Sequence, residues 1–449
     1  MTNQIKKLKA KKDKNSGCIF CQNNKKFNIP KEIIEALIKG NLVIFAGAGV
    51  STETKTVFPF NLYEDIKNEL RIKKTEDISF SQLMSKYCEK NGGRSKLLQK
   101  IKERFDYVKS FPELYRNATR FHDELSTIYH VENIITTNWD DFFETRCGAI
   151  PIVNEKDFVF WNNPGRKVFK IHGSINNLGS IVATEEDYKK CYKNLKLGII
   201  GSALKLLLAT KSIVFMGYSF QDDDFNKIYT FLKKEMDDIL HRSYIVSLDT
   251  PLAKLNSTVI NTDATYFIRV LKEQLIKEKQ IIDDQRFEGV SLALEKVQMN
   301  HYVLSEIDLK KNPEIIYATS YQDGLIHSFE RMLTLKKTGY YSHECNIKKS
   351  IEKYHKIRKE KIQKKKYFDV AYIDGYINGL IYLLVNDLAR KGIPFYYVFG
   401  SKRDILNIKD FIKISKQSRK IHKSAYQLAE RLTKQYSATE TLHHTPFLL

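Results

Sequence analysis

Short apolar runs alternate with amphipathic segments between residues 30 and 270, and this alternation restricts the fold more than any other feature of the chain. Runs rich in Ile, Val and Phe occur at 41–46, 132–137, 166–171, 211–216 and 242–248. Segments with helical periodicity lie between them, at 61–72, 111–130 and 222–240. Near-continuous apolar strands separated by helices are typical of a mostly parallel sheet with both faces covered. The sequence therefore predicts an α/β fold with a Rossmann-like parallel sheet and helices on both faces.

The pattern changes after residue 270, where long helical stretches follow one another at 287–307, 313–333 and 367–392, with 394–399 as a strand candidate. We therefore expect a basic N-terminal segment at 1–29, the α/β domain at 30–275 and a mostly α-helical C-terminal domain at 285–449. The large apolar faces of stretches such as 377–388 predict a homo-oligomer built through this last domain. "YQDGLI" at 321 and "YIDGYI" at 372 would fit a degenerate repeat, although two short copies also arise by chance.

The composition predicts a folded cytoplasmic protein that does not span a membrane. With 449 residues, 42% of them apolar, the chain has room for two or three domains with their own cores. The best candidate for a membrane segment, "GLIYLLV" at 379–385, is far shorter than the roughly 20 residues that a membrane helix needs. The lysine-rich N-terminus has no apolar core of a secretory signal, and six cysteines do not make a disulfide framework in a chain of this size.

The formal net charge of +21 permits contact with nucleic acid through its phosphates. Much of the excess lies in the first 14 residues and at 348–366. The simpler interpretation of 348–366 is the solvated face of a long helix. Nucleic-acid binding through the basic segments stays open.

The first apolar run ends on Gly47-Ala48-Gly49, and Ser51 follows two residues later. Glycine allows the backbone to approach a ligand closely, and free N–H groups at this point suit a pyrophosphate. The full G-x-G-x-x-G spacing is absent, so a tight strand–helix turn without a ligand is the alternative.

Three further runs end on small and polar residues, which are Thr137, Asn138 and Asp140 after the second, His172 after the third, and Gly217, Ser219 and Asp222 after the fourth. Because the carboxyl ends of parallel strands meet at one edge of a sheet, these groups would line a cleft for a phosphate-bearing ligand. Each also has a structural explanation, since the acidic residues suit helix caps and His172 suits a buried core position.

Together these motifs, G-A-G-x-S, T-x-N-x-D, H-G and G-x-S, resemble the sirtuin-like NAD-binding domain over residues 30–270. "TTNWDDFFE" and "GYSFQDDDF" are similar to the bacterial branch found in antiphage defence, which includes the Thoeris effector and the defence-associated sirtuins. The resemblance implies NAD⁺ as the substrate and Asn138, Asp140 and His172 as catalytic residues. It implies that NAD⁺ is held by Gly47, Ala48, Gly49, Ser51, Thr137, Gly217, Ser219 and Asp222.

One departure from the sirtuin pattern concerns zinc. Protein-deacylase sirtuins carry two C-x-x-C pairs after the histidine, whereas His172 to Gly217 contains only Cys191 here, so no four-thiolate site can form. The pair Cys18 and Cys21 is half a zinc site, which Cys88, His122 or another subunit would have to complete. We expect two unligated cysteines there and no metal site.

The expected chemistry is cleavage of the bond between nicotinamide and ribose, which develops oxocarbenium character on the sugar. His172 suits the proton acceptor, Asn138 can orient a ribose hydroxyl or water, and Asp140 offers charge or a structural hydrogen bond. Since the peptide-binding module is missing, water is the expected acceptor. The sequence thus predicts an NAD⁺ glycohydrolase that releases ADP-ribose and nicotinamide and depletes NAD⁺ in antiphage defence by abortive infection.

Two other functions remain open from the sequence. One is an ADP-ribosyl or acyl transferase acting on a macromolecule, and the other is a nucleotide sensor with little turnover that binds nucleic acid. The resemblance also implies control by a partner such as an ATPase or an Argonaute, or by a phage trigger.

Overall fold

The computed structural model describes residues 27–54, 56–73, 75–218, 230, 234, 243–248, 257–385, 393–401, 404–435 and 443–447. The chain forms two compact units, Met1–Glu278 and Lys279–Leu449, here called the α/β unit and the helical unit. The basic segment predicted at 1–29 and the helix predicted at 222–240 lie almost entirely outside the described residues. The roles predicted for the parts of the chain stay predictions.

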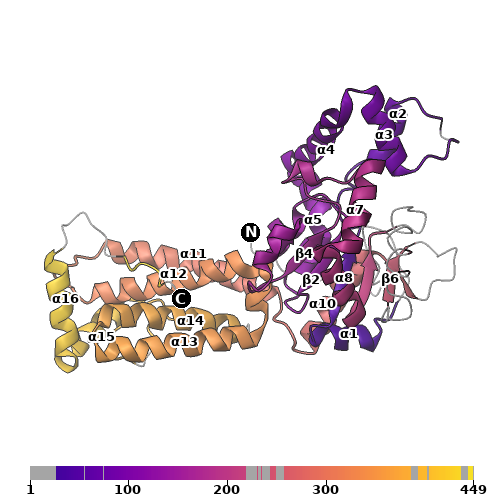
Figure 1. The fold of residues 1–449 in the computed structure, drawn as a ribbon. Coiled ribbons are helices and arrows are strands. Elements are labelled where there is room, and N and C mark those ends of the chain that lie inside the picture. Colours follow the sequence, from indigo (N-terminus) through magenta and orange to yellow (C-terminus); the bar gives the residue numbers. More distant parts are fainter. Residues whose placement is uncertain are drawn as a thin grey trace, which may run out of the picture. The chain divides into compact units, whose positions relative to one another are not determined.

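A seven-stranded sheet forms the centre of the α/β unit (Figure 1). Its strands are β1 (Leu42–Ala46), β2 (Asn133–Thr136), β3 (Ile150–Ile152), β4 (Lys167–Lys170), β5 (Ser212–Met216), β6 (Ser243–Ser247) and β7 (Thr258–Asn261). Every pair is parallel, and the order is β3-β4-β2-β1-β5-β6-β7. The predicted α/β class, followed by a helical C-terminal region, is confirmed.

The described helices of this unit are α1 (Lys31–Ile38), α2 (Leu62–Glu69), α3 (Phe80–Lys90), α4 (Gly93–Ser110), α5 (Pro112–Ser126), α6 (Phe142–Cys147), α7 (Glu185–Leu197), α8 (Ile199–Thr210) and α10 (Ala264–Lys277), with short 3₁₀ turns η2 (Ala48–Val50), η3 (Glu155–Phe160) and η4 (Leu178–Ser180). Side chains of α7 and α8 join Phe45, Phe169 and Phe215 in one apolar cluster on the sheet. All residues of β1 and β6 are buried, which requires cover on both faces. Helix α1 contacts β1, and α10 contacts β6.

All five predicted runs form strands, whereas β3 and β7 are not among the predicted ones. Both lie at the edges of the sheet, and they span only three and four residues. Pro151 lies within β3, a position that proline tolerates at a sheet edge because one side of the strand needs no hydrogen-bond partner. Short, partly exposed edge strands lack the continuous apolar signal that reveals central strands.

Helices α2, α3 and α4 form an apolar cluster inserted between β1 and β2 in sequence. This cluster also takes in Ile181 and Ala183, from the segment that follows β4. Arg94 of α4 donates hydrogen bonds to the carboxylate of Asp187 (2.5 Å) and to the carbonyl oxygen of Ile181 (2.7 Å). The inserted helices are thereby fixed against the start of α7 and the segment that precedes it.

The helical unit consists of α11 (Gln285–Ser305), α12 (Ile315–Leu335), α13 (Glu344–Gln363), α14 (Tyr367–Val385), α15 (Ile408–Ile421) and α16 (Lys423–Gln435), with turns η6 (Lys336–Thr338) and η7 (Tyr340–Ser342). The four long helices α11 to α14 lie side by side (Figure 1). The strand expected at 394–399 is absent: within the described residues, Tyr396 forms a single antiparallel bridge with Ile405. Tyr396 and Val398 pack into a small cluster around Phe411, whereas Tyr397 and Phe399 pack against the main cluster of the unit.

The two similar segments, "YQDGLI" at 321 and "YIDGYI" at 372, meet where α12 packs on α14. A Cβ atom on Gly324 would lie 2.0 Å from the carbonyl oxygen of Tyr372, and one on Gly375 would lie 1.9 Å from that of Tyr321. Each glycine therefore admits the backbone of the other segment, so the two segments form a reciprocal helix contact. The internal repeat itself stays a prediction.

Helix α14 is long and apolar enough to cross a membrane by length and composition, with a mean hydropathy of 1.3 over its most apolar window. The sequence alone predicts no membrane segment here. Its apolar residues lie all around the helix because α12 and α13 pack on it, and residues such as Ala371 and Leu380 are buried. A helix that is apolar all round is typical of the core of a bundle. The apolar surface from which assembly was predicted is thus largely used within the unit.

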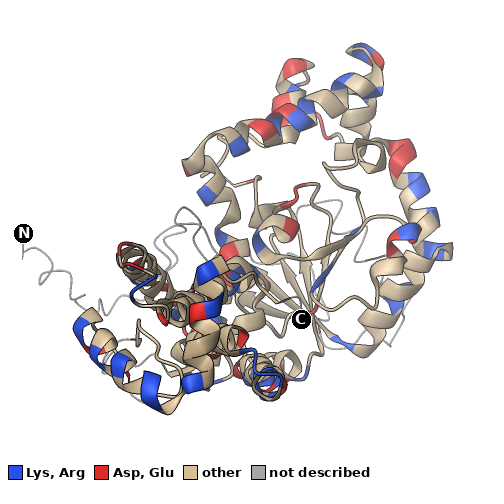
Figure 2. Cartoon of the chain, turned by 90° about the vertical axis from the view of Figure 1, so that its left-hand side faces the viewer, with Lys and Arg blue, Asp and Glu red and all other residues tan. Residues whose placement is uncertain are grey.

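The basic stretch at 348–366 falls mainly on α13, whose lysines are mostly exposed. Arg358 and Lys361 instead form ion pairs with Asp374 and Asp369 of α14. Lys and Arg occur on many separate helices of both units (Figure 2). The stretch is therefore a solvated helix face, as its simpler interpretation predicts, and nucleic-acid binding through it stays a prediction.

Candidate active site

The sheet register brings the predicted site segments to one edge. Thr136, the last residue of β2, is paired with Ala46 of β1 and with Lys170 of β4. Asn138 and His172 each lie two residues beyond these paired positions, in the segments that follow the adjacent strands β2 and β4. Strands β2 and β4 lie on one side of β1, and the next strand, β5, lies on its other side. The direction in which strands are added to the sheet therefore reverses beside β1. Ligands of open α/β sheets bind at such a point, beyond the carboxyl ends of the strands.

A hydrogen-bond network links Ser51, Asn138 and Asp140. Ser51 Oγ donates to Asp140 Oδ2 (2.8 Å), and Asn138 Nδ2 donates to the carbonyl oxygen of Gly47 (3.1 Å) and to Ser51 Oγ (3.3 Å). Asp140 Oδ1 accepts from the backbone N–H of Phe142 (3.1 Å). Both amide hydrogens of Asn138 thus face the protein, and both oxygens of Asp140 are occupied.

Several buried polar atoms at this edge have no hydrogen-bond partner among the described residues. Asn138 Oδ1 and His172 Nε2 are the two that belong to predicted catalytic residues, and Trp139 Nε1 and Asp141 Oδ1 are in the same condition. The side chains of Asn138 and His172 are only 5% and 3% exposed. Leaving a buried polar atom without a partner costs about 1–3 kcal/mol, so a ligand that supplies the missing hydrogen bond would be favoured at either position. Asn138 Oδ1 and His172 Nε2 can both accept a hydrogen bond from a ligand.

His172 is enclosed by apolar groups. The edge of its ring meets the ring of Tyr188, with 5.1 Å between centroids. Burial lowers the pKa of His172 from 6.5 to about 4, because the charged imidazolium loses its hydration. The imidazole is therefore neutral at pH 7 and carries a lone pair that can take a proton.

Lys170 is a buried cation that the sequence analysis did not single out. Its Nζ donates to the carbonyl oxygens of Asp140 and Trp139 and to Oε1 of Glu144 (3.0 Å). Burial raises the pKa of Asp140, and the neighbouring Lys170 charge opposes that rise. The available signal was a lysine as the last residue of the strand "KVFK", two residues before His172.

The glycines of the first motif pack against the loop after β5. A Cβ on Gly47 would lie 2.7 Å from the ring of Tyr218, and one on Gly49 would lie 2.8 Å from the carbonyl oxygen of Gly217. Gly217 itself has φ of +72°, which favours glycine. The close backbone approach inferred from the sequence therefore occurs within the protein.

Several amides proposed to hold the pyrophosphate already have partners in the protein. The N–H of Gly49 donates to Gly217 (2.9 Å), and those of Val50 and Ser51 donate to Gly47 and Ala48. Thr137, another predicted contact, pairs its hydroxyl with that of Tyr218 at 3.1 Å. Ligand binding by this loop stays a prediction, and Tyr218 joins it as a neighbour that the sequence analysis missed.

The remaining predicted residues fall into two groups. Cys191 on α7 is buried and donates to the carbonyl oxygen of Ile171 (3.3 Å), so it is a packed thiol without other sulfur ligands between His172 and Gly217. Ser219, Asp222, Cys18 and Cys21 lie outside the described residues.

The chain is similar in sequence to several known proteins. A family model described as a SIR2-like domain matches residues 132–271. An NAD(+) hydrolase ThsA from Cytobacillus dafuensis is 31% identical over 45% of this chain and 40% of its own length. An NAD(+) hydrolase ThsA from Enterococcus faecium is 26% identical over 60% of this chain and 52% of its own length. Defense-associated sirtuin 2 from Bacillus subtilis is 24% identical over 62% of this chain and 27% of its own length.

The chain thus spans about half or less of the length of these relatives. Among solved structures, a Sir2 homolog–NAD complex is 13% identical, with a TM-score of 0.32, over 56% of this chain and 96% of that chain.

Proposed function

We propose that this chain, which carries a SIR2-like domain related to the ThsA NAD⁺ hydrolases and the defence-associated sirtuins, hydrolyses NAD⁺ to ADP-ribose and nicotinamide. The observation that carries the proposal is the pair of buried acceptor atoms without partners, Asn138 Oδ1 and His172 Nε2. They follow adjacent strands at the same level, beside the point where the strand order reverses.

In the proposed reaction the bond between the ribose C1′ atom and the nicotinamide nitrogen breaks, and its electron pair leaves with nicotinamide. Water adds to the oxocarbenium carbon and loses a proton. Nε2 of the neutral His172 accepts that proton, and Asn138 Oδ1 accepts a hydrogen bond from the water or a ribose hydroxyl. The proton then passes to solvent, so the products are nicotinamide, ADP-ribose and H⁺.

Asp140 is proposed as a positioning residue, since its two oxygens already accept hydrogen bonds from Ser51 and Phe142. It fixes Ser51, whose hydroxyl oxygen in turn accepts from Asn138. The amide of Asn138 is thereby held with Nδ2 towards its two acceptors, the Gly47 carbonyl oxygen and Ser51 Oγ, and with Oδ1 turned away from them. This replaces the more general catalytic role that the sequence suggested for Asp140.

Burial of both acceptor atoms supports a resting state that needs activation. NAD⁺ can contact Nε2 of His172 only after the side chains that cover it move, because the atom is inaccessible to solvent. An antiphage effector that depletes NAD⁺ must be held inactive until infection. We propose that a partner or a phage component supplies the activating signal.

Product analysis tests the proposal directly. The purified chain, alone and with proteins encoded beside it, is incubated with NAD⁺ labelled in the adenosine part. We expect equal amounts of nicotinamide and free labelled ADP-ribose. Transfer of the label to protein or nucleic acid would identify a transferase. Binding of NAD⁺ without its cleavage, in activated preparations, would identify a nucleotide sensor.

A further inference from the structure

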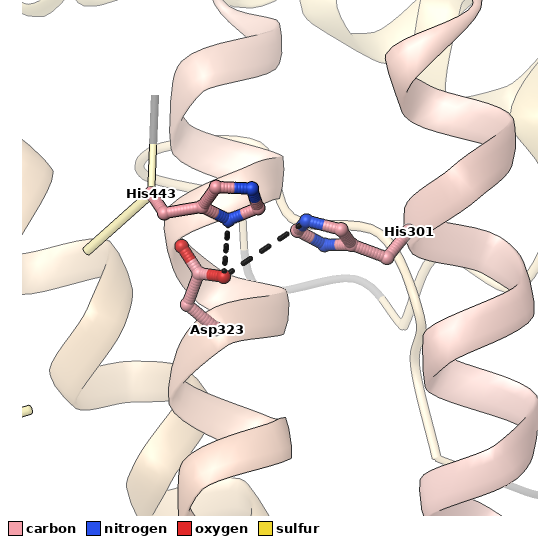
Figure 3. Close-up of side chains that lie close together, drawn as sticks. All are labelled: His301, Asp323 and His443. Carbon is pink, nitrogen blue, oxygen red and sulfur yellow. Dashed lines mark hydrogen bonds and ion pairs between the residues drawn. The ribbon is translucent and has the colours of Figure 1, made fainter. Parts of the chain in front are cut away.

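Three side chains from separate parts of the helical unit converge on one point (Figure 3). They are His301 of α11, Asp323 of α12 and His443 of the C-terminal segment 443–447. His443 Nδ1 lies 3.1 Å from Asp323 Oδ1, and His301 Nε2 lies 3.9 Å from the same oxygen. Each residue offers one ligand atom, and the three atoms lie within 4.8 Å of one another.

The tautomer of His301 is set by Gln322, which is fully buried. Gln322 Nε2 donates to the carbonyl oxygen of Phe395 (2.8 Å), so its Oε1 is the atom that faces His301 Nδ1 at 3.0 Å. Nδ1 must therefore carry the hydrogen and donate it, which leaves the lone pair of a neutral His301 on Nε2. Metal-binding histidines are held in this way, with the second ring nitrogen donating to a carbonyl or carboxylate oxygen.

The lone pair on Nε2 faces a carboxylate oxygen that also carries lone pairs. Two such atoms repel each other unless a cation lies between them, and 3.9 Å is too long for a direct hydrogen bond. Atoms bound to one transition-metal ion lie roughly 3 to 4 Å apart, because the metal–ligand bonds are about 2 Å long. The two separations that involve Asp323 Oδ1, 3.1 and 3.9 Å, fit this range, and the shorter of them is a hydrogen bond with His443 that an ion would replace. All three ligand atoms lie within 4.8 Å of one another, so the two histidines would move slightly closer to each other on binding.

We propose that His301, Asp323 and His443 bind one divalent transition-metal ion, of the zinc class, with at least one position left for water. Two imidazoles and one carboxylate are a ligand set that zinc and its first-row neighbours accept. This site is independent of the proposed NAD⁺ hydrolysis and of the Cys18–Cys21 pair.

The ion would fasten the C-terminal segment to α11 and α12. Without it, the segment already docks through His444, whose N–H donates to Asp323 Oδ2 (2.7 Å) and whose ring stacks on Tyr372 at 4.1 Å. Asp323 thus holds the segment through one oxygen and offers the other to the metal. His443 is half exposed, so an ion can enter from solvent.

Co²⁺ is the probe for this site, because its visible absorption reports the ligands. The full chain is prepared with Cys18→Ser and Cys21→Ser, so that thiolates of the pair cannot contribute, and is treated with a chelator before titration. We expect one equivalent of Co²⁺ to bind without a sulfur-to-metal charge-transfer band. His443→Gln should weaken this binding by at least about 10-fold, and Gln322→Leu by about 10- to 100-fold, the loss typical of removing a supporting partner.

His355→Gln is the matched control, since His355 is exposed on α13 of the same unit. It should bind Co²⁺ like the parent. His443→Gln changes a half-exposed side chain near the end of the chain, so the helical unit should stay folded, which circular dichroism checks. Equal Co²⁺ affinity of His443→Gln and His355→Gln, or no stoichiometric binding by the parent, would overturn the proposal and leave a plain hydrogen-bonded cluster.

Discussion

The hydroxyl of Ser51 donates a 2.8 Å hydrogen bond to the carboxylate of Asp140 and so joins the segment after β1 to the segment after β2. The same hydroxyl oxygen accepts from the side-chain amide of Asn138. The orientation of the Asn138 amide, which we propose to be catalytic, therefore depends on Ser51 and Asp140. The hydrogen bonds of these two side chains are already made within the protein.

Asp140→Asn should lower turnover more than NAD⁺ affinity. The new NH₂ group must face either the N–H of Phe142 or the Ser51 hydroxyl, and both are donors to the present carboxylate. The network that holds Asn138 is then disturbed, and we expect kcat to fall about 10²-fold, as for other small losses of alignment. Separate measurements of kcat and of NAD⁺ dissociation check this. A loss confined to affinity would contradict the positioning role.

Gly49→Ala should destabilise the α/β unit even without NAD⁺. Its Cβ would lie 2.8 Å from the carbonyl oxygen of Gly217, so the loop must shift, at a cost of about 1–3 kcal/mol. Gly179→Ala is the matched control, because its Cβ would come no closer than 3.6 Å to any neighbour. Urea denaturation of the two variants compares them. Equal stability would show that the glycine is needed for a ligand alone.

Acid should destabilise the protein partly through His172. In the unfolded chain His172 binds a proton below about pH 6.5, but in the folded chain only below about pH 4. The unfolded state thus binds more protons between these values, so the stability present above pH 6.5 is lost as the pH falls towards 4. One pKa unit corresponds to about 1.4 kcal/mol. His172→Gln should flatten the decline in urea stability over this window, and an unchanged pH dependence would count against a buried neutral imidazole.

We expect the predicted homo-oligomer to form through α11 of the helical unit. Leu292 and Met299 are 59% and 71% exposed, and with Val303 they recur at seven- and four-residue spacing on one helix face. A second copy of this chain is the occupant that we expect for this apolar stripe. Leu292→Glu with Met299→Glu should therefore yield a folded monomer by light scattering. A parent protein that is already monomeric at all working concentrations would contradict the prediction.

The central strands were predictable because β1 and β5 are almost entirely apolar and each is followed directly by a glycine. The edge strands β3 and β7 were not, since three or four partly exposed residues give too short a signal. In the helical unit, the apolar run of α14 suggested free surface, but it is buried because α12 and α13 both pack on it.

Some residues of the candidate site could also be predicted from the sequence, and others could not. Asn138 and His172 follow strong strand signals, so their common edge could be inferred from sequence, whereas their burial and missing partners could not. Lys170 and Tyr218 were missed because a lone lysine or tyrosine at a strand end is not a motif. The metal-ligand cluster joins residues 301, 323 and 443, and no local pattern connects such distant positions.

The most direct test of the proposed hydrolysis is nicotinamide release by His172→Ala and Asn138→Ala, measured beside NAD⁺ binding in a preparation whose parent protein is active. Loss of the proton acceptor or of the orienting amide should lower turnover by about 10²- to 10⁴-fold while NAD⁺ still binds. If both variants are folded and release nicotinamide at the parent rate, Asn138 and His172 are not the catalytic pair.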